Sequence, residues 1–298
     1  MRDLAQTLLR RLSPASLVET ALRRANLSKV AGLVALGKAA FTMTLGARHI
    51  GLEFPSALVI APGDVRIQKE IPHLKILRST HPLPGPASFA AGAAIQGFLR
   101  TLPDSEDPLL VLTSGGASAL AALPVEGLSM AEKTAVHQSL LTSGQSISAI
   151  NTVRRHLSDL KGGKALRQAL ARNLSVRVLA ISDVPGNHPW DIGSGPFSPY
   201  PTTFGEALAS ATQIPGFPEQ ALHILREGTA GRREETLKPD QVPLKHWNYE
   251  VLAGPGYVLD VAAHLLQERH ETVQICPLAM SGSPILWSHR FRQWLSQP

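Results

Sequence analysis

Two clusters of residues in the middle of the chain have the composition of an anion-binding site. The first is the turn Ser114-Gly115-Gly116, which follows an apolar run and has Ser118 directly behind it. Two successive glycines let a ligand approach bare backbone N–H groups, and the start of a following helix favours negative charge. The second cluster lies beside Gly162-Gly163 and contains Asn151, Arg154, Arg155, His156, Ser158, Lys161 and Lys164. Amides from one cluster and cations from the other predict a site for phosphate or carboxylate.

Other polar residues follow apolar segments at positions suited to the same site. Lys38 comes after residues 29–36, His81 after residues 73–79, and Asp183 ends the segment 176–183. A cation at the start of a helix is disfavoured by the helix dipole, so Lys38 suggests an anionic partner. Asp183 has a position typical of a carboxylate that binds a metal ion or acts as a base. Ser194 and Gly195 offer further donors in a loop rich in glycine and proline.

Each of these residues also has an ordinary structural interpretation. Arg154 and its neighbours could form a solvated basic face, and one arginine of the pair is expected to be structural. Asp183 could cap a helix, and His81, held extended by Pro82, could be a packed loop residue. The sequence contains neither the Walker spacing nor a G-x-G-x-x-G after the first strand. It also lacks H-E-x-x-H, H-x-x-E-H and a second cysteine. This argues against a P-loop, a classical dinucleotide site and a zinc site.

The hydrophobic pattern predicts a doubly wound α/β fold with a mostly parallel sheet, a Rossmann-like arrangement with helices on both faces. Nearly continuous apolar runs are typical of strands covered on both faces. Amphipathic stretches between them predict helices, and this alternation favours a parallel sheet whose ligands bind at the strand ends. The predicted strands are 29–36, 56–62, 73–79, 108–114, 176–183, 247–254 and 272–279. The predicted helices are 38–49, 87–101, 129–144, 145–159, 164–172, 205–212, 217–227 and 255–268.

Composition narrows the class of protein. The chain has 298 residues, 44% of them hydrophobic, and a net charge of +6. Aromatic residues make up only 5%, so stacking surfaces for nucleic acid are scarce, and an anionic small molecule explains the basic charge as well. No apolar run is long enough to span a bilayer, so we expect no membrane partner.

The single cysteine, Cys276, fits a reducing cytoplasm and is expected to be a buried structural thiol. The Arg-rich N-terminus is interpreted as two surface helices rather than a transit peptide.

Five segments, in this order, resemble the glycerate 2-kinase family, whose members are sometimes labelled hydroxypyruvate reductase. They read ALGKAAFTM (35–43), THPLPGPAS (80–88), LTSGGASAL (112–120), SGQSISAINTVRRHLSDLKGGKAL (143–166) and ISDVPGNHPWDIGSGP (181–196). The resemblance implies that residues 1–280 form the family's N-terminal α/β domain and that 281–298 form a short helical tail. The family's second domain, called MOFRL, is then missing.

The same resemblance implies a function and a set of site residues. The function is phosphoryl transfer from ATP, with Mg²⁺, to a small anionic hydroxy acid such as D-glycerate. The implied catalytic residues are Lys38, Arg154 and Asp183, with Asp183 also holding the metal ion. The implied ATP-binding residues are Ser114, Gly115, Gly116, Ser118, Lys161, Ser194 and Gly195, and the implied substrate-binding residues are His81, Asn151 and Asn187.

The sequence departs from the family pattern at positions that bear on catalysis. Neutral residues replace family acids at Gly85, Ala149, Asn187 and Tyr200, and Ala117 replaces a glycine. Phosphoryl transfer depends on carboxylates that hold Mg²⁺ and orient the hydroxyl. A different class of function therefore stays open, namely a non-catalytic or partner-dependent subunit that binds an anion. A homodimer or a separate chain would then supply the missing domain. Hydroxypyruvate reduction is a weaker alternative because the dinucleotide fingerprint is absent.

Overall fold

The computed structural model describes residues 2–65, 71–276 and 284–296. Contacts divide the chain into two compact units, one of residues Ser13–Gly254 and one formed by the segments before Ser13 and after Gly254. The expected boundary at residue 280 falls outside the described residues. None of the helices in the described part combines the length and the apolar character needed to cross a membrane.

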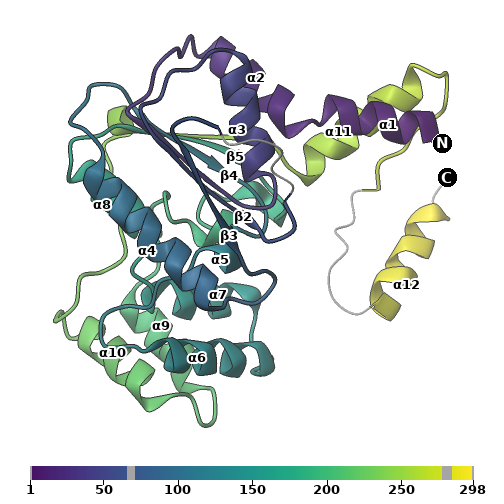
Figure 1. Ribbon diagram of the computed structural model, residues 1–298. Helices are drawn as coiled ribbons and strands as arrows, with labels where there is room; N and C mark the ends of the chain where they lie inside the picture. Colours follow the sequence, from purple (N-terminus) through teal and green to yellow (C-terminus); the bar gives the residue numbers. More distant parts are fainter. Residues whose placement is uncertain (1, 66–70, 277–283, 297–298) are drawn as a thin grey trace. The chain divides into compact units, whose positions relative to one another are not determined.

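The larger unit is built on a six-stranded sheet in which all paired strands run parallel (Figure 1). The strands are β1 (Gly32–Leu36), β2 (Ala57–Pro62), β3 (Leu74–Ser79), β4 (Leu109–Thr113), β5 (Val176–Ile181) and β6 (Trp247–Ala253), in the order β3-β2-β1-β4-β5-β6. This confirms the predicted parallel α/β sheet. The strand order reverses between β1 and β4, and doubly wound folds bind their ligands outside the carboxyl ends of the strands at such a point.

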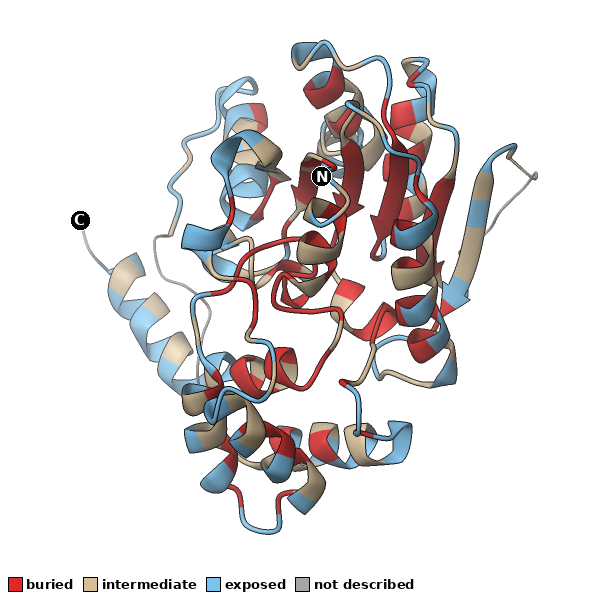
Figure 2. Cartoon of the chain, turned by 90° about the vertical axis from the view of Figure 1, so that its left-hand side faces the viewer, coloured by how far each residue is buried: buried red, intermediate tan, exposed pale blue. Residues whose placement is uncertain are grey.

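Helices cover both faces of the sheet because alternate strand residues point to opposite sides. On one face, Leu33 and Leu110 pack with α2 (Pro14–Arg24) and α3 (Ala40–His49). On the other, Val34 and Val111 pack with α4 (Pro86–Thr101) and α8 (Lys164–Leu170). The central strands are buried along their whole length, as Figure 2 shows in red. This explains why the strand sequences are apolar without alternation.

A second cluster of buried residues lies among helices beyond the carboxyl ends of the strands (Figure 1). It joins α6 (Met130–Thr142), α7 (Ile147–His156), α9 (Phe204–Thr212) and α10 (Glu219–Thr229). Side-chain caps define where three of these helices begin, since Ser129, Ser146 and Thr203 each accept a backbone N–H of the first turn. Shorter elements complete the unit: α5 (Ala117–Leu120), η1 (Pro185–Asn187), η2 (Ile192–Ser194), η3 (Pro239–Gln241) and η4 (Leu244–His246).

The smaller unit consists of three helices in its described part. They are α1 (Arg2–Arg11), α11 (Pro255–Gln267) and α12 (Pro284–Leu295), and α1 contacts α11. The predicted strand over 272–279 is not formed at residues 272–276, and 277–279 lie outside the described residues. Residues 271–276 are exposed or half-buried, so Cys276 is half-buried and not the buried thiol expected from its apolar neighbours.

Candidate active site

The glycine turn after β4 presents two backbone N–H groups that no described residue accepts. Neither Gly115 nor Gly116 donates a hydrogen bond within the described chain, whereas the flanking Ser114 amide bonds to β1 and the Ala117 amide closes the turn. Gly116 has a φ of +85°, a backbone conformation that favours glycine. Successive unpaired amides form a concave donor set that suits an anion. The turn can therefore offer two backbone donors to an anion, and the predicted anion site stays a prediction.

Residues from three other strand ends surround this turn. A Cβ atom added to Gly116 would lie 3.1 Å from His81 Cδ2 and 3.2 Å from Lys38 Cε. A Cβ added to Gly115 would lie 2.2 Å from Asp183 Oδ2. Lys38, His81 and Asp183 follow β1, β3 and β5 respectively, and all three are exposed. The structure thus brings together a cation, an imidazole and a carboxylate at two adjacent glycines.

The turn after β1 is tied to the turn after β4. The Lys38 backbone N–H donates to the Gly115 carbonyl at 2.9 Å, and the Ala39 N–H donates to Ser114 Oγ at 3.0 Å. Ser114 is 2% exposed. Ser114 was predicted to bind the cofactor, and its hydroxyl oxygen here accepts from the loop that carries Lys38. It therefore positions Lys38 relative to the glycines.

An open pocket of about 640 Å³ lies beside the turn, at the carboxyl ends of β1, β2 and β3. Its polar lining includes Lys38, Asp64, Thr80 and His81. Asp64 follows the buried strand β2 after Pro62-Gly63 and was not singled out by the sequence analysis. Its position after a buried strand is the signal that could have identified it, because the same reasoning selected Asp183.

Ser118 links the predicted basic cluster to the loop around Ser194. Its hydroxyl lies 2.8 Å from Ser194 Oγ, 3.2 Å from an Arg154 guanidinium nitrogen and 2.8 Å from Lys161 Nζ. Lys161 is 2% exposed and also donates to the Ser118 carbonyl at 2.8 Å. Burial, followed by the charge of Arg154, lowers the pKa of Lys161 well below its ordinary value. Burial and Arg155 also lower the pKa of Arg154.

Arg155 is structural, as expected for one arginine of the pair. It is 1% exposed, pairs with Asp191 at 2.8 Å, and donates to the Trp190 carbonyl at 2.6 Å. Its guanidinium carbon also lies 4.1 Å from the centre of the Tyr200 ring. Tyr200 is one of the neutral replacements seen in the sequence, and here it is a buried ring partner of Arg155.

Three predicted site residues have other surroundings. The Gly195 amide donates to Ile192 at 3.0 Å and its carbonyl accepts from Gly163 at 2.8 Å, so this glycine supports the loop. Asn187 lies against Gly254 at the end of β6, where a Cβ would come 2.4 Å from its amide oxygen. Asn151 is half-buried on α7, one turn before Arg154, and its side chain makes no hydrogen bond within the described residues.

His156, another member of the basic cluster, is fully buried, and its Nε2 lies 2.9 Å from Glu235 Oε1. Burial alone would raise the pKa of Glu235, but His156 and the backbone amides of Phe204 and Thr236 lower it to about 2. A lowered carboxylate pKa stabilises the fold above the ordinary value of 4.5, and this stability is lost as the pH falls towards 2. The pair therefore makes the helical part of this unit sensitive to acid.

We expect Glu235→Gln to lower the free energy of unfolding by about 1.5–3 kcal/mol at pH 7, because a charge-assisted hydrogen bond to a buried group is lost. The difference from wild type should shrink as the pH falls below about 4.5. Urea unfolding at pH 7 and pH 3.5 measures both. Glu234→Gln, which removes a carboxylate that is 73% exposed, is the matched control and should change little. An equal loss for both variants at every pH would contradict this.

Comparison with known proteins places the chain in a family. The family described as "Domain of unknown function (DUF4147)" matches residues 1–226. The glycerate 2-kinase of Pyrococcus horikoshii is 36% identical over 212 residues, covering 70% of this chain and 46% of that protein. The crystal structure of glycerate kinase from Thermotoga maritima superposes with a TM-score of 0.79 at 28% identity, covering 91% of this chain and 62% of that one. The chain belongs to the glycerate 2-kinase family.

Within the glycerate 2-kinase family, not all relatives are named as kinases. A protein of Agrobacterium vitis named "Putative hydroxypyruvate reductase" is 36% identical over 215 residues, covering 70% of this chain and 45% of that protein. The chain therefore spans about half the length of these curated relatives. The family assignment confirms the resemblance that the five sequence segments indicated.

Proposed function

We propose that this chain transfers the γ-phosphoryl group of ATP to the hydroxyl group of a small hydroxy acid such as D-glycerate. The observation that carries the proposal is the meeting of Lys38, His81 and Asp183 at the unpaired amides of Gly115 and Gly116. This meeting point lies at the carboxyl ends of β1 and β4, the two strands between which the strand order reverses. Relatives that carry the name glycerate 2-kinase support the reaction class.

The residues at the turn suit this reaction. The hydroxyl oxygen bonds to the γ-phosphorus, the bond between that phosphorus and the bridging oxygen of ADP breaks, and the hydroxyl proton passes to a carboxylate. Lys38 and the amides of Gly115 and Gly116 would bind the negative charge on the phosphoryl oxygens. Asp64 lines the open pocket beside Lys38 and would accept the proton or orient the hydroxyl.

The donor set fits Mg²⁺ as this ion is usually bound in kinases. Mg²⁺ needs only one or two carboxylates when substrate phosphates complete its octahedral shell. No group of three or more metal-binding side chains occurs among the described residues, so a dedicated protein cage is not seen there. Asp183, whose carboxylate lies against Gly115, is the residue that would hold the ion. An Mg²⁺ ion bound there would neutralise negative charge on the phosphate groups.

The test is ATP consumption with D-glycerate and a panel of other small hydroxy acids, with and without Mg²⁺. We expect turnover with at least one acid and its complete loss when EDTA removes the metal ion. Product analysis should find the phosphate on the acid. ATP hydrolysis that does not depend on any acid, or no turnover and no binding of either substrate, would overturn the proposal.

A partner-dependent subunit is the second candidate, because neutral residues stand at four positions where the family pattern has acids, namely Gly85, Ala149, Asn187 and Tyr200. Here the same residues bind the anion, and a second copy or a separate chain is needed for turnover. Calorimetric binding of D-glycerate and ADP without turnover would favour this candidate. Hydroxypyruvate reduction is tested in the same series by NADH oxidation with hydroxypyruvate. A lysine-bearing loop, and not a G-x-G-x-x-G turn, follows β1 and argues against it.

A further inference from the structure

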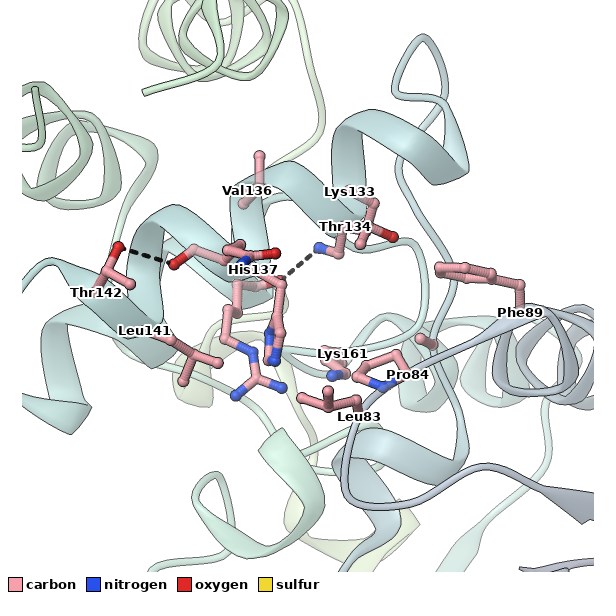
Figure 3. Close-up of a pocket in the computed structure, with 13 residues that line it drawn as sticks. Leu83, Pro84, Phe89, Lys133, Thr134, Val136, His137, Leu141, Thr142 and Lys161 are labelled. Carbon is pink, nitrogen blue, oxygen red and sulfur yellow. Dashed lines mark hydrogen bonds between the residues drawn. The ribbon is translucent and has the colours of Figure 1, made fainter. Parts of the chain in front are cut away.

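A second pocket, of about 250 Å³, is lined in part by residues of the basic cluster. The loop before α4 contributes Leu83 and Pro84, and α6 contributes Lys133, His137 and Leu141. Arg154 and Lys161 also line the pocket, as do the uncharged polar residues Thr134, Gln138 and Thr142. Figure 3 shows the side chains of His137, Lys161 and Leu83 around the same space, with Leu141 on one side and Phe89 on the other. The sequence analysis did not single out Lys133, His137 or Leu141.

The positive charge in this pocket has no carboxylate partner within the described residues. Lys133 donates to the carbonyls of Leu157 at 2.6 Å and Arg154 at 3.4 Å. None of the salt bridges found in the described chain includes Lys133, Arg154 or Lys161. The nearby carboxylate of Asp159 is already paired with Lys164 at 3.3 Å. Lys161 is buried and Lys133 and Arg154 are half-buried. Cations withdrawn from water without a counter-charge are costly, and an anion would reduce that cost.

The same charges act on the ionisable groups of α6. Burial, followed by the charges of Arg154 and Lys164, lowers the pKa of Lys133 to about 7. Burial, followed by the charges of Arg154, Lys161 and Lys133, lowers the pKa of His137 to about 4. In both groups burial is the larger cause, and the neighbouring cations add to it. His137 is therefore neutral at pH 7 and can contribute a ring face or a hydrogen bond.

Apolar side chains form much of the remaining lining, and some of them face water. Leu83 is 59% exposed and Leu141 is 56% exposed at the pocket, whereas Phe89 is 8% exposed. A pocket for inorganic phosphate alone would have no use for these side chains. Apolar walls with a few convergent polar groups are typical of sites for organic ligands, in which the polar groups set the orientation.

We propose that this pocket binds an organic anion that has a phosphate or carboxylate at one end and an apolar body at the other. The charged end would lie against Lys133, Arg154 and Lys161, and the apolar body would cover Leu83 and Leu141. Arg154 and Lys161 line this pocket and also contact the Ser118 hydroxyl in the candidate active site. This inference rests on the residues that line the pocket and does not require that the chain be a kinase.

Phenyl phosphate is the probe, with inorganic phosphate and phenol as its two halves. Isothermal titration calorimetry on the full chain should show phenyl phosphate binding more tightly than either half. Equal affinity for phenyl phosphate and inorganic phosphate, or no binding of phenyl phosphate, would overturn the proposal. Competition with ADP separates two sources of the ligand, since displacement would identify a nucleotide and its absence a small aryl or acyl anion.

Variants of the rim test the apolar wall without disturbing the core. Leu83→Ser and Leu141→Ser should each weaken phenyl phosphate binding about fivefold, because buried apolar surface is lost, and leave inorganic phosphate binding unchanged. Met130→Ser is the matched control, since Met130 is 57% exposed on the same helix α6 but does not line the pocket. An equal effect of Met130→Ser would contradict the assigned wall.

Lys133→Met tests the charged end of the pocket. It should weaken phenyl phosphate and inorganic phosphate alike, by about tenfold, because one charge-assisted contact is lost. Circular dichroism verifies that each variant is folded before titration. Because these are binding measurements, they stay informative if the kinase assay fails, and a working kinase with no phenyl phosphate site would refute this inference alone.

Discussion

Replacing Lys38 with Met should lower kcat/KM for phosphoryl transfer by about 10²–10³-fold, the usual cost of removing one preorganised charge-stabilising donor. Lys38 is exposed and its backbone, which donates to Gly115, is unchanged by the substitution. The loss should therefore appear in turnover and not in folding. A steady-state assay with ATP and D-glycerate measures it, and thermal unfolding by circular dichroism measures the fold.

Lys75→Met is the matched control for this substitution. Lys75 is an exposed lysine of β3 that does not line the open pocket beside Lys38. Lys75→Met removes one positive charge, as Lys38→Met does, so a general effect of net charge would appear in both variants. Unchanged turnover in Lys38→Met, or an equal loss in Lys75→Met, would remove Lys38 from the proposed site.

The sheet and its loops could be predicted because their signals are local. Six strands follow from apolar runs, although the edge strands β3 and β6 are mostly half-buried or exposed and not buried as expected. The residues after strands β1, β3, β4 and β5 were chosen because parallel strands place their carboxyl ends at one edge. The glycine turn at 114–116 and Lys38 are close in space for this reason alone. The failed strand at 272–279 had the same apolar pattern, but its part at 272–276 pairs with no described strand.

Local sequence patterns do not predict which way an individual side chain points. Arg154 and Arg155 are adjacent, and consecutive helical residues point about 100° apart. Which of them faces the core depends on Asp191, which is brought near only by folding. Lys133 and His137 lie on a helix with no marked sequence motif, and their role depends on packing against the loop at residues 83–84. Such residues become visible only when the elements are assembled.

Replacing Arg155 should destabilise the fold much more than replacing its neighbour Arg154. Arg155→Met leaves the Asp191 carboxylate and the Trp190 carbonyl without their buried partner, so we expect the free energy of unfolding to fall by about 3–5 kcal/mol. Arg154 has no carboxylate partner among the described residues. Its removal should change stability by less than about 1 kcal/mol. Urea unfolding of both variants provides the comparison, and Asp191→Asn gives a milder version if Arg155→Met does not fold.

Arg154→Met should also act on the pocket in a way that a surface substitution could not. The charge of Arg154 is the largest cause, after burial, of the lowered pKa of His137. Its removal should therefore raise that pKa from about 4 towards the ordinary value of 6.5, which an NMR titration of the imidazole protons measures. Phenyl phosphate affinity should fall in the same variant, because the anion loses one of its cations. If the His137 titration does not move, Arg154 does not face the pocket, and the division of the pair into one structural and one ligand-facing arginine is wrong.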